Sequence, residues 1–232
     1  GACSDYRREV FRDVKAEGLY EILRGFCREM KERREAMGRK ETVKAAQQKA
    51  VWHVREVKLY CDAFGNLSAE LQGLALGSRG MREFREYLEA YLAGEGFLRM
   101  RQEAERLTGQ IEGLRLVLTY ESDRIIIAQG EASGSYEDFL KKCFPGHKKQ
   151  FVSPFGAEPD LVELEAELLK AFRKRNQELF LDAERFFAEY GEYTDAALIR
   201  FASEIGFYLS FYRFEQKMKE RGFSFADPRT LE

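Results

Sequence analysis

Apolar residues recur at spacings of three and four along most of the chain, which is the pattern of helices that bury one face. Residues 4–37 follow this pattern with Gly18 as the one weak point, so we expect one long helix or two shorter ones there. A second helix is predicted over 41–64, because Gly65-Asn66 supplies a stop signal directly after it.

Shorter elements are predicted in the middle of the chain. Helices are expected over 81–91 and 97–114, where apolar side chains keep the helical spacing. Apolar residues then alternate over 114–120 and a β-branched run follows over 124–128, which predicts a β-hairpin. A short helix over 136–143 completes this region, because it begins with capping chemistry and stops before a proline.

Two long helices are predicted at the end, over 159–190 and 195–221, separated by Gly191. Because their apolar faces are wide, we expect them to form an antiparallel pair against the first two helices. The predicted fold class is therefore all-α, an elongated bundle of long helices with a small β-hairpin and short-helix appendage. The predicted regions are core and lever helices over 1–114, an inserted appendage over 115–157 and the long terminal helices over 158–232.

Positive and negative charges nearly cancel, since 38 lysines and arginines face 40 aspartates and glutamates and the net charge is −2. Such a balance is typical of solvated helix faces and argues against a chain devoted to polyanion binding. The four cysteines form no CxxC pair and only two histidines occur, so neither a disulfide framework nor a zinc site is indicated. With no apolar run long enough to span a membrane, we expect a cytoplasmic protein without a membrane partner.

Four stretches carry a resemblance to a known family. They are 74–91 (LALGSRGMREFREYLEAY), 114–129 (LRLVLTYESDRIIIAQ), 201–214 (FASEIGFYLSFYRF) and 222–228 (GFSFADP). In pattern and order they resemble the core and lever segments of the MutS family of DNA mismatch-repair ATPases, and the last is similar to the approach to the nucleotide-binding domain. The resemblance covers nearly the whole chain and implies, over 115–157, a reduced form of the family's DNA clamp.

The resemblance also says which chemistry to expect elsewhere. No G-x-x-x-x-G-K-[ST] phosphate loop occurs, so we expect ATP and Mg²⁺ to bind only in an ATPase domain outside this chain, with no cofactor, catalytic residue or metal site within it. The family's mismatch-reading Phe-x-Glu belongs to another domain, and the same spelling at Phe84 and Phe187 is expected to be core packing. The partners that the resemblance implies are double-stranded or branched DNA, the ATPase domain, and a second copy of the full-length protein.

The candidate DNA-contacting residues lie in one basic loop of the predicted appendage. They are Lys141, Lys142, His147, Lys148 and Lys149. Clustered lysines neutralise phosphates without reading sequence, and protonation of the histidine would add to the attraction. A solvated basic loop without a ligand is the alternative, because lysine-rich loops are common on protein surfaces.

Two further features are weighed against ordinary packing. His53, beside the lone Trp52, lies near an apolar seam and is expected to be a packed histidine with one hydrogen bond. The aromatic run over 207–214 is expected to be helix core or an interface to a missing domain. The sequence thus predicts a mechanical segment of a MutS-like mismatch-repair or recombination ATPase that couples nucleotide state to DNA engagement. A helical protein–protein interaction scaffold without a DNA role is the alternative.

Overall fold

The computed structural model describes residues 2–15, 18–114, 116–121, 124–129, 174 and 176–225. This part of the chain contains seven helices, which confirms the predicted helical class. The elements in chain order are α1 (Ala2–Lys15), α2 (Leu19–Thr42), α3 (Ala46–Gln72), α4 (Arg79–Leu92), α5 (Glu95–Glu112), β1 (Leu116–Glu121), β2 (Arg124–Gln129), α8 (Gln177–Glu189) and α9 (Ala196–Glu220). Among the helices described, none combines the length and apolar character that crossing a membrane requires.

The first apolar stretch forms two helices, so the structure decides between the alternatives that the sequence left open. α1 ends at Lys15 and α2 begins at Leu19. Gly18 lies between them with a φ of 91°, in the left-handed region that residues with a Cβ rarely adopt. The glycine therefore permits a sharp change of direction, after which Leu19 and Leu23 are buried in the core.

The second helix is longer than predicted, and both its predicted start at 41, which belongs to α2, and its predicted end at Gly65-Asn66 are wrong. α3 begins at Ala46 and continues through this dipeptide to Gln72. Phe64 and Leu67, on either side of the dipeptide, are 0% and 1% exposed. Burying two such side chains contributes about 3–6 kcal/mol, which outweighs the roughly 1 kcal/mol that a glycine costs inside a helix.

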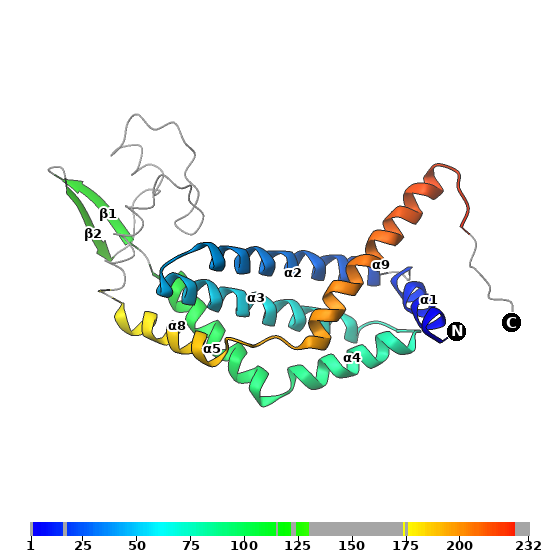
Figure 1. The fold of residues 1–232 in the computed structure, drawn as a ribbon, viewed down its shortest axis with the longest axis horizontal. Helices are drawn as coiled ribbons and strands as arrows, with labels where there is room; N and C mark the ends of the chain where they lie inside the picture. The colour runs from blue at the N-terminus through cyan, green and yellow to red at the C-terminus, as the bar shows by residue number, and fades with distance from the viewer. Residues whose placement is uncertain are drawn as a thin grey trace.

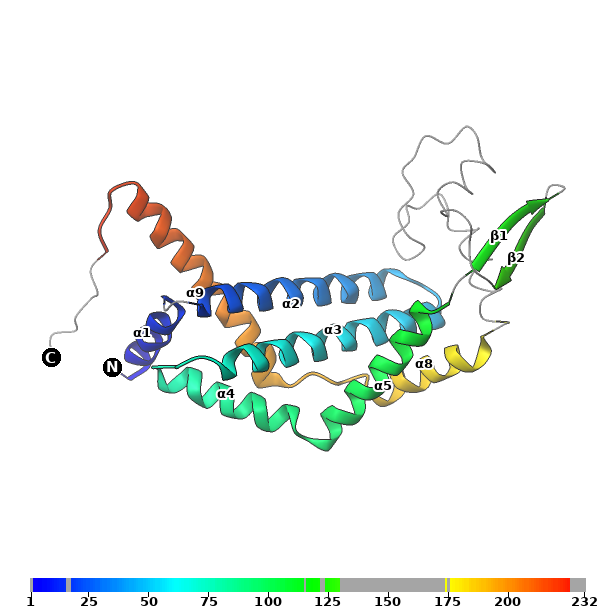
Figure 2. The same ribbon diagram turned by 180° about the vertical axis from the view of Figure 1, so that it is seen from behind.

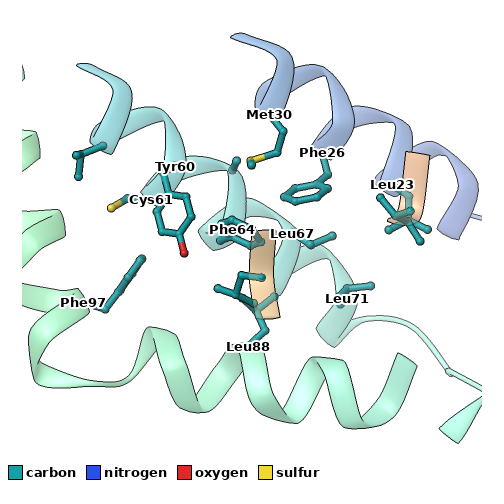
Figure 3. Close-up of a cluster of buried hydrophobic side chains, with 14 of the residues drawn as sticks. Leu23, Phe26, Met30, Tyr60, Cys61, Phe64, Leu67, Leu71, Leu88 and Phe97 are labelled. Atoms are coloured by element: carbon teal, nitrogen blue, oxygen red, sulfur yellow. The ribbon is translucent and has the colours of Figure 1, made fainter. Parts of the chain in front are cut away.

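α3 lies at the centre of the helical core. It runs alongside α2 in the opposite direction and also contacts α4, α5 and α8, as Figure 1 shows. Tyr60 and Phe64 of α3 are fully buried. Figure 3 shows Phe26 from α2, Leu88 from α4 and Phe97 from α5 gathered around them, so the apolar stripes of four helices meet in one core.

The two strands form an antiparallel pair in which Leu116 lies opposite Gln129 and Glu121 lies opposite Arg124. The pair follows α5 almost directly in the chain. Figures 1 and 2 place it at the end of the molecule where α2 turns into α3. The short helix predicted over 136–143 lies outside the described residues.

The last two helices differ from the prediction. Asn176 has a φ of −121° and a ψ of 41°, which are not helical, so the predicted unbroken helix over 159–190 is wrong at this position, and residues 159–173 lie outside the described part. α8 packs against α3 and α5, whereas α9 packs against α2 and α1. They are not the predicted antiparallel pair, because the extended segment between them carries α9 across the bundle (Figure 2).

Candidate functional site

The predicted DNA-contacting loop, with Lys141, Lys142, His147, Lys148 and Lys149, lies outside the described residues. His53 lies within them, in a group of charged and polar side chains enclosed between α2, α3 and the segment that joins α8 to α9. We call this group the ionic joint. Its members are Arg33, Lys40, His53, Glu56 and Tyr193.

Glu56 lies at the centre of the ionic joint and is 2% exposed. Its Oε1 accepts hydrogen bonds from Arg33 Nη2 at 3.2 Å and from Tyr193 Oη at 2.6 Å. Its Oε2 accepts a hydrogen bond from Lys40 Nζ at 2.6 Å. Both carboxylate oxygens are therefore engaged, which stabilises the buried negative charge and leaves this carboxylate poorly placed to act as a general base.

Arg33 and Lys40 reach Glu56 from one side of α2. They are separated by two helical turns, so their side chains project from the same face. Arg33 is 8% exposed, and its Nε also donates a hydrogen bond to Tyr193 Oη at 2.9 Å. Two positive charges thus meet one carboxylate at a place that is largely closed to water, where charge interactions are stronger than at a surface.

His53 is fully buried, so the prediction of a packed histidine is confirmed. Its Nε2 lies 3.0 Å from the carbonyl oxygen of Tyr190 and must carry the proton of that hydrogen bond. Nδ1 then presents a lone pair to Lys40 Nζ at 3.3 Å. Burial lowers the pKa of His53, the Tyr190 carbonyl partly offsets this and the Lys40 charge lowers it further, so the neutral imidazole is favoured.

Tyr193 belongs to the segment between α8 and α9 and anchors it to the core. Burial raises the pKa of its hydroxyl, which therefore stays protonated and donates to Glu56. Its ring meets the ring of Tyr60 edge-on, with centroids 5.2 Å apart. Two residues later, the Asp195 amide donates to Tyr60 Oη at 3.2 Å, and the Asp195 carboxylate caps α9 by accepting from the Leu198 amide at 3.0 Å.

These contacts fix where α9 begins relative to α2 and α3. Tyr190 and Tyr193 each bond to a side chain of the joint, while Asp195 is held by Tyr60. Within the described residues, no group of three histidine, cysteine, aspartate or glutamate side chains could hold a metal ion. The arrangement of the joint is suited to holding helices in a set orientation.

Comparisons with protein families, with curated proteins and with solved structures find no match to this chain. The joint and the helices that meet at it therefore carry the functional argument from the structure.

Sequence reasoning missed four of the five members of the joint, although α2 carried a signal. Arg33 follows Leu23, Phe26 and Met30 at helical spacing, which places a charge on the buried stripe. A charged residue is rarely buried without a partner, so Arg33 called for a buried carboxylate. Glu56, three residues after His53 on the neighbouring helix, supplies it.

The residues with the Phe-x-Glu spelling are packed, as predicted. The ring of Phe84 stacks on that of Phe201 from α9, with centroids 3.5 Å apart. Phe187 lies against His53 with ring centroids 4.4 Å apart. Both are partly buried against the main core, which confirms a packing role for each.

The aromatic run over 207–214 lies largely at the surface of α9. Leu209 is buried and Tyr208 packs partly against the core, whereas Phe207 and Phe214 are 69% and 52% exposed. The structure therefore excludes a core role for these two phenylalanines within the described part of the chain. We call the exposed phenylalanines of α9 and of the segment that follows it the aromatic face; they are Phe207, Phe211, Phe214, Phe223 and Phe225.

Proposed function

We propose that this chain is the core and lever segment of a MutS-like DNA mismatch-repair or recombination ATPase, and that its helices form an elongated bundle that transmits movement. The observation that carries the proposal is the ionic joint. It ties the beginning of α9 to the α2 and α3 pair through Tyr193 and Glu56. A displacement of α9 would therefore move the pair with it, because packed helices shift as rigid bodies.

The proposed path of the movement runs along α9. This helix has 25 residues, so it is about 38 Å long at roughly 1.5 Å per residue. Its first turn lies at the joint, and the aromatic face lies on its second half and on the residues that follow it. We propose that the ATPase domain of the parent protein docks on this face, binds ATP and Mg²⁺, and shifts α9 when its nucleotide state changes.

The proposed DNA-facing end is the opposite one, where the strands lie. There the region over 115–157 would act as a reduced clamp, with its basic loop, Lys141 to Lys149, contacting the phosphate backbone. The parent protein is proposed to be a homodimer that encloses double-stranded or branched DNA. Two of the stretches that carry the family resemblance lie on α4 and α9, the helices whose Phe84 and Phe201 rings stack on each other.

The DNA part of the proposal is tested by a fluorescence-anisotropy titration of the chain against a labelled duplex and a four-way junction. Binding that weakens steeply between about 50 and 200 mM salt is expected for phosphate contacts. The variant in which Lys141, Lys142, Lys148 and Lys149 are replaced by alanine should lose most of this binding. Salt-dependent binding that this variant retains in full would contradict the proposed clamp.

The second candidate function is a helical scaffold for another protein, and the exposure of the aromatic face favours it. Phenylalanines in this number at a surface are typical of protein-binding sites. A scaffold should bind its partner at high salt and lose it when Phe207 and Phe214 become serine. Lysine replacements in the 141–149 loop should leave that binding unchanged, so the two functions give opposite patterns.

A further inference from the structure

Helix α1 lies between two helices that come much later in the chain. It contacts α4 and α9 as well as its neighbour α2. Figures 1 and 2 place it at the end of the bundle where α4 begins and where α9 crosses α2. Val10 and Val14 of α1 are 5% and 0% exposed, so apolar packing holds the helix on the bundle. Its charged side chains reach the two later helices.

Asp13 joins α1 to the beginning of α4. Its Oδ1 accepts a hydrogen bond from the Gly77 amide at 3.1 Å, and its Oδ2 accepts from the amide and the hydroxyl of Ser78 at 2.8 Å and 2.6 Å. Ser78 is the N-cap of α4, and its Oγ accepts a hydrogen bond from the Met81 amide at 3.3 Å. Since Asp13 and Ser78 are 9% and 3% exposed, this link is enclosed within the protein.

Two contacts join the same helix to the second half of α9. Lys15 Nζ donates a hydrogen bond to Glu215 Oε1 at 2.9 Å and lies 2.7 Å from Oε2, across 200 positions of the chain. The Glu215 side chain is 4% exposed, and Lys219 of α9 itself pairs with it at 2.8 Å. The Phe11 ring packs on that of Phe211, with centroids 5.0 Å apart. A buried carboxylate of α9 therefore depends on α1 for its partner from another helix.

The two links leave α1 on opposite faces. Phe11 and Lys15 are four residues apart, so their side chains share one face of the helix. Asp13 lies between them, and at 3.6 residues per turn its side chain projects roughly 160° away from each. α1 thus has α9 on one face and α4 on the other. We call Phe11, Asp13 and Lys15 the α1 bridge.

We propose that the α1 bridge couples the second half of α9 to the beginning of α4, so that a displacement of α9 also moves α4; this inference rests on the proposed lever function. One rigid turn of helix connects the two links, and packed helices shift as rigid bodies. Phe211 belongs to the aromatic face, so a domain that docks there reaches the bridge through Phe11. The ionic joint holds the start of α9, and the bridge gives it a second point of attachment.

Hydrogen exchange of the full chain, followed by mass spectrometry, tests the bridge. Lys15→Gln removes the cation that reaches Glu215 from α1, and the matched control Lys219→Gln removes the cation that reaches the same carboxylate from within α9. We expect Lys15→Gln to speed exchange in the first two turns of α4 by about threefold, because couplings between packed elements change a local equilibrium by roughly two- to thirtyfold. Lys219→Gln should leave α4 unchanged.

Coupling is reciprocal, so a change at the α4 end should also reach α9. Ser78→Ala removes the hydroxyl that donates to Asp13, and it should speed exchange in the second half of α9 by a similar factor. Glu83→Gln is the control at this end, because it breaks only a surface pair with Arg79 in the same part of α4. This control should leave α9 unchanged.

The pattern of exchange decides the proposal. Faster exchange at both far ends supports the bridge, and Lys15→Arg, which keeps the charge, should then exchange like the original chain. Unchanged exchange in α4 for Lys15→Gln would overturn the bridge, as would an equal effect of Lys219→Gln. An equal increase in the amides of α3 would mean a general loss of stability and would also overturn it. Each of these failures leaves the lever proposal to be decided by variants of the ionic joint.

Discussion

Replacing Glu56 by glutamine is the most direct test of the ionic joint. The substitution keeps the shape of the side chain and removes its charge, while Arg33 and Lys40 keep theirs. Tyr193 can still donate its hydrogen bond to the amide oxygen. The loss therefore comprises the charge of both ion pairs, at 3.2 Å and 2.6 Å, and the hydrogen bond from Lys40 Nζ, because the amide nitrogen that replaces Oε2 cannot accept it.

The expected cost follows from how far each cation can return to water. Removing one partner of a buried ion pair costs about 3–5 kcal/mol, because the other charge stays buried. The Lys40 side chain is 18% exposed and can turn toward solvent, whereas the Arg33 side chain is 9% exposed and is held between Glu56 and Tyr193. Since one cation is trapped and one is not, we expect Glu56→Gln to lower the free energy of unfolding by about 3 kcal/mol.

Urea denaturation followed by circular dichroism measures this loss. Glu83→Gln is the matched control, because Glu83 pairs with Arg79 at a surface where both side chains are more than half exposed, and it should change stability by less than about 0.5 kcal/mol. Adding Arg33→Gln to Glu56→Gln should cost less than the sum of the two single losses, because the trapped charge is then absent. A loss below about 1 kcal/mol for Glu56→Gln alone would refute the view that this carboxylate balances a buried charge.

Three further predictions follow from buried groups and backbone geometry. Burial lowers the pKa of His53 below its ordinary value of about 6.5, so the unfolded chain binds a proton at a higher pH than the folded chain does. The free energy of unfolding should therefore fall as the pH drops below about 6.5, by at most about 1.4 kcal/mol per pH unit, until the pKa of the folded state is reached. Urea midpoints at about pH 7 and 5 should show a smaller fall for His53→Gln, while His147→Gln serves as the second-histidine control. Burial raises the pKa of the Cys61 thiol to about 12, so the thiol should be unreactive in the folded chain. In a variant whose other cysteines are replaced by serine, a thiol reagent should label Cys61 only as fast as the protein unfolds. Faster labelling would contradict the burial of this side chain. Gly18→Ala should lower the free energy of unfolding by about 1–2 kcal/mol because Gly18 has a positive φ. Gly65→Ala should raise it by about 0.5–1 kcal/mol, because an added Cβ would meet nothing closer than 3.9 Å inside a helix. Urea denaturation that shows the same sign for both substitutions would refute the assigned backbone.

Elements that depend on a few neighbouring residues could be predicted from the sequence. The start of α9 is one example, because Asp195 accepts hydrogen bonds from the amides of Ala197 and Leu198, within its own first turn. The two glycines show the limit of such signals. Gly18 lies directly before α2, whereas Gly65 lies inside α3, and the difference is in the neighbouring packing, since Phe64 and Leu67 beside Gly65 are buried in the core.

The ionic joint depends on contacts that no local pattern contains. Glu56 and Tyr193 are 137 positions apart, and their hydrogen bond exists only because the segment after α8 returns to α3. Charges on long helices are usually solvated, so Arg33 and Glu56 resemble ordinary surface residues unless their place on the apolar stripe is weighed. The sequence therefore predicted the helices more fully than the way they are joined.

The use of charge at this position bears on what the joint does. A buried ion pair is weak evidence for stability, because apolar side chains of similar volume often replace one at no cost. Its hydrogen bonds are directional, however, and Tyr193 satisfies Arg33 and Glu56 together only in one position of the segment before α9. We therefore infer that the joint sets the direction of α9. Arg33→Met with Glu56→Leu and Tyr193→Phe should keep stability within about 1 kcal/mol of the original while the amides of the first turns of α9 exchange hydrogen faster. Unchanged exchange in that variant would mean that apolar packing alone directs the helix, and a lever would then need another point of attachment.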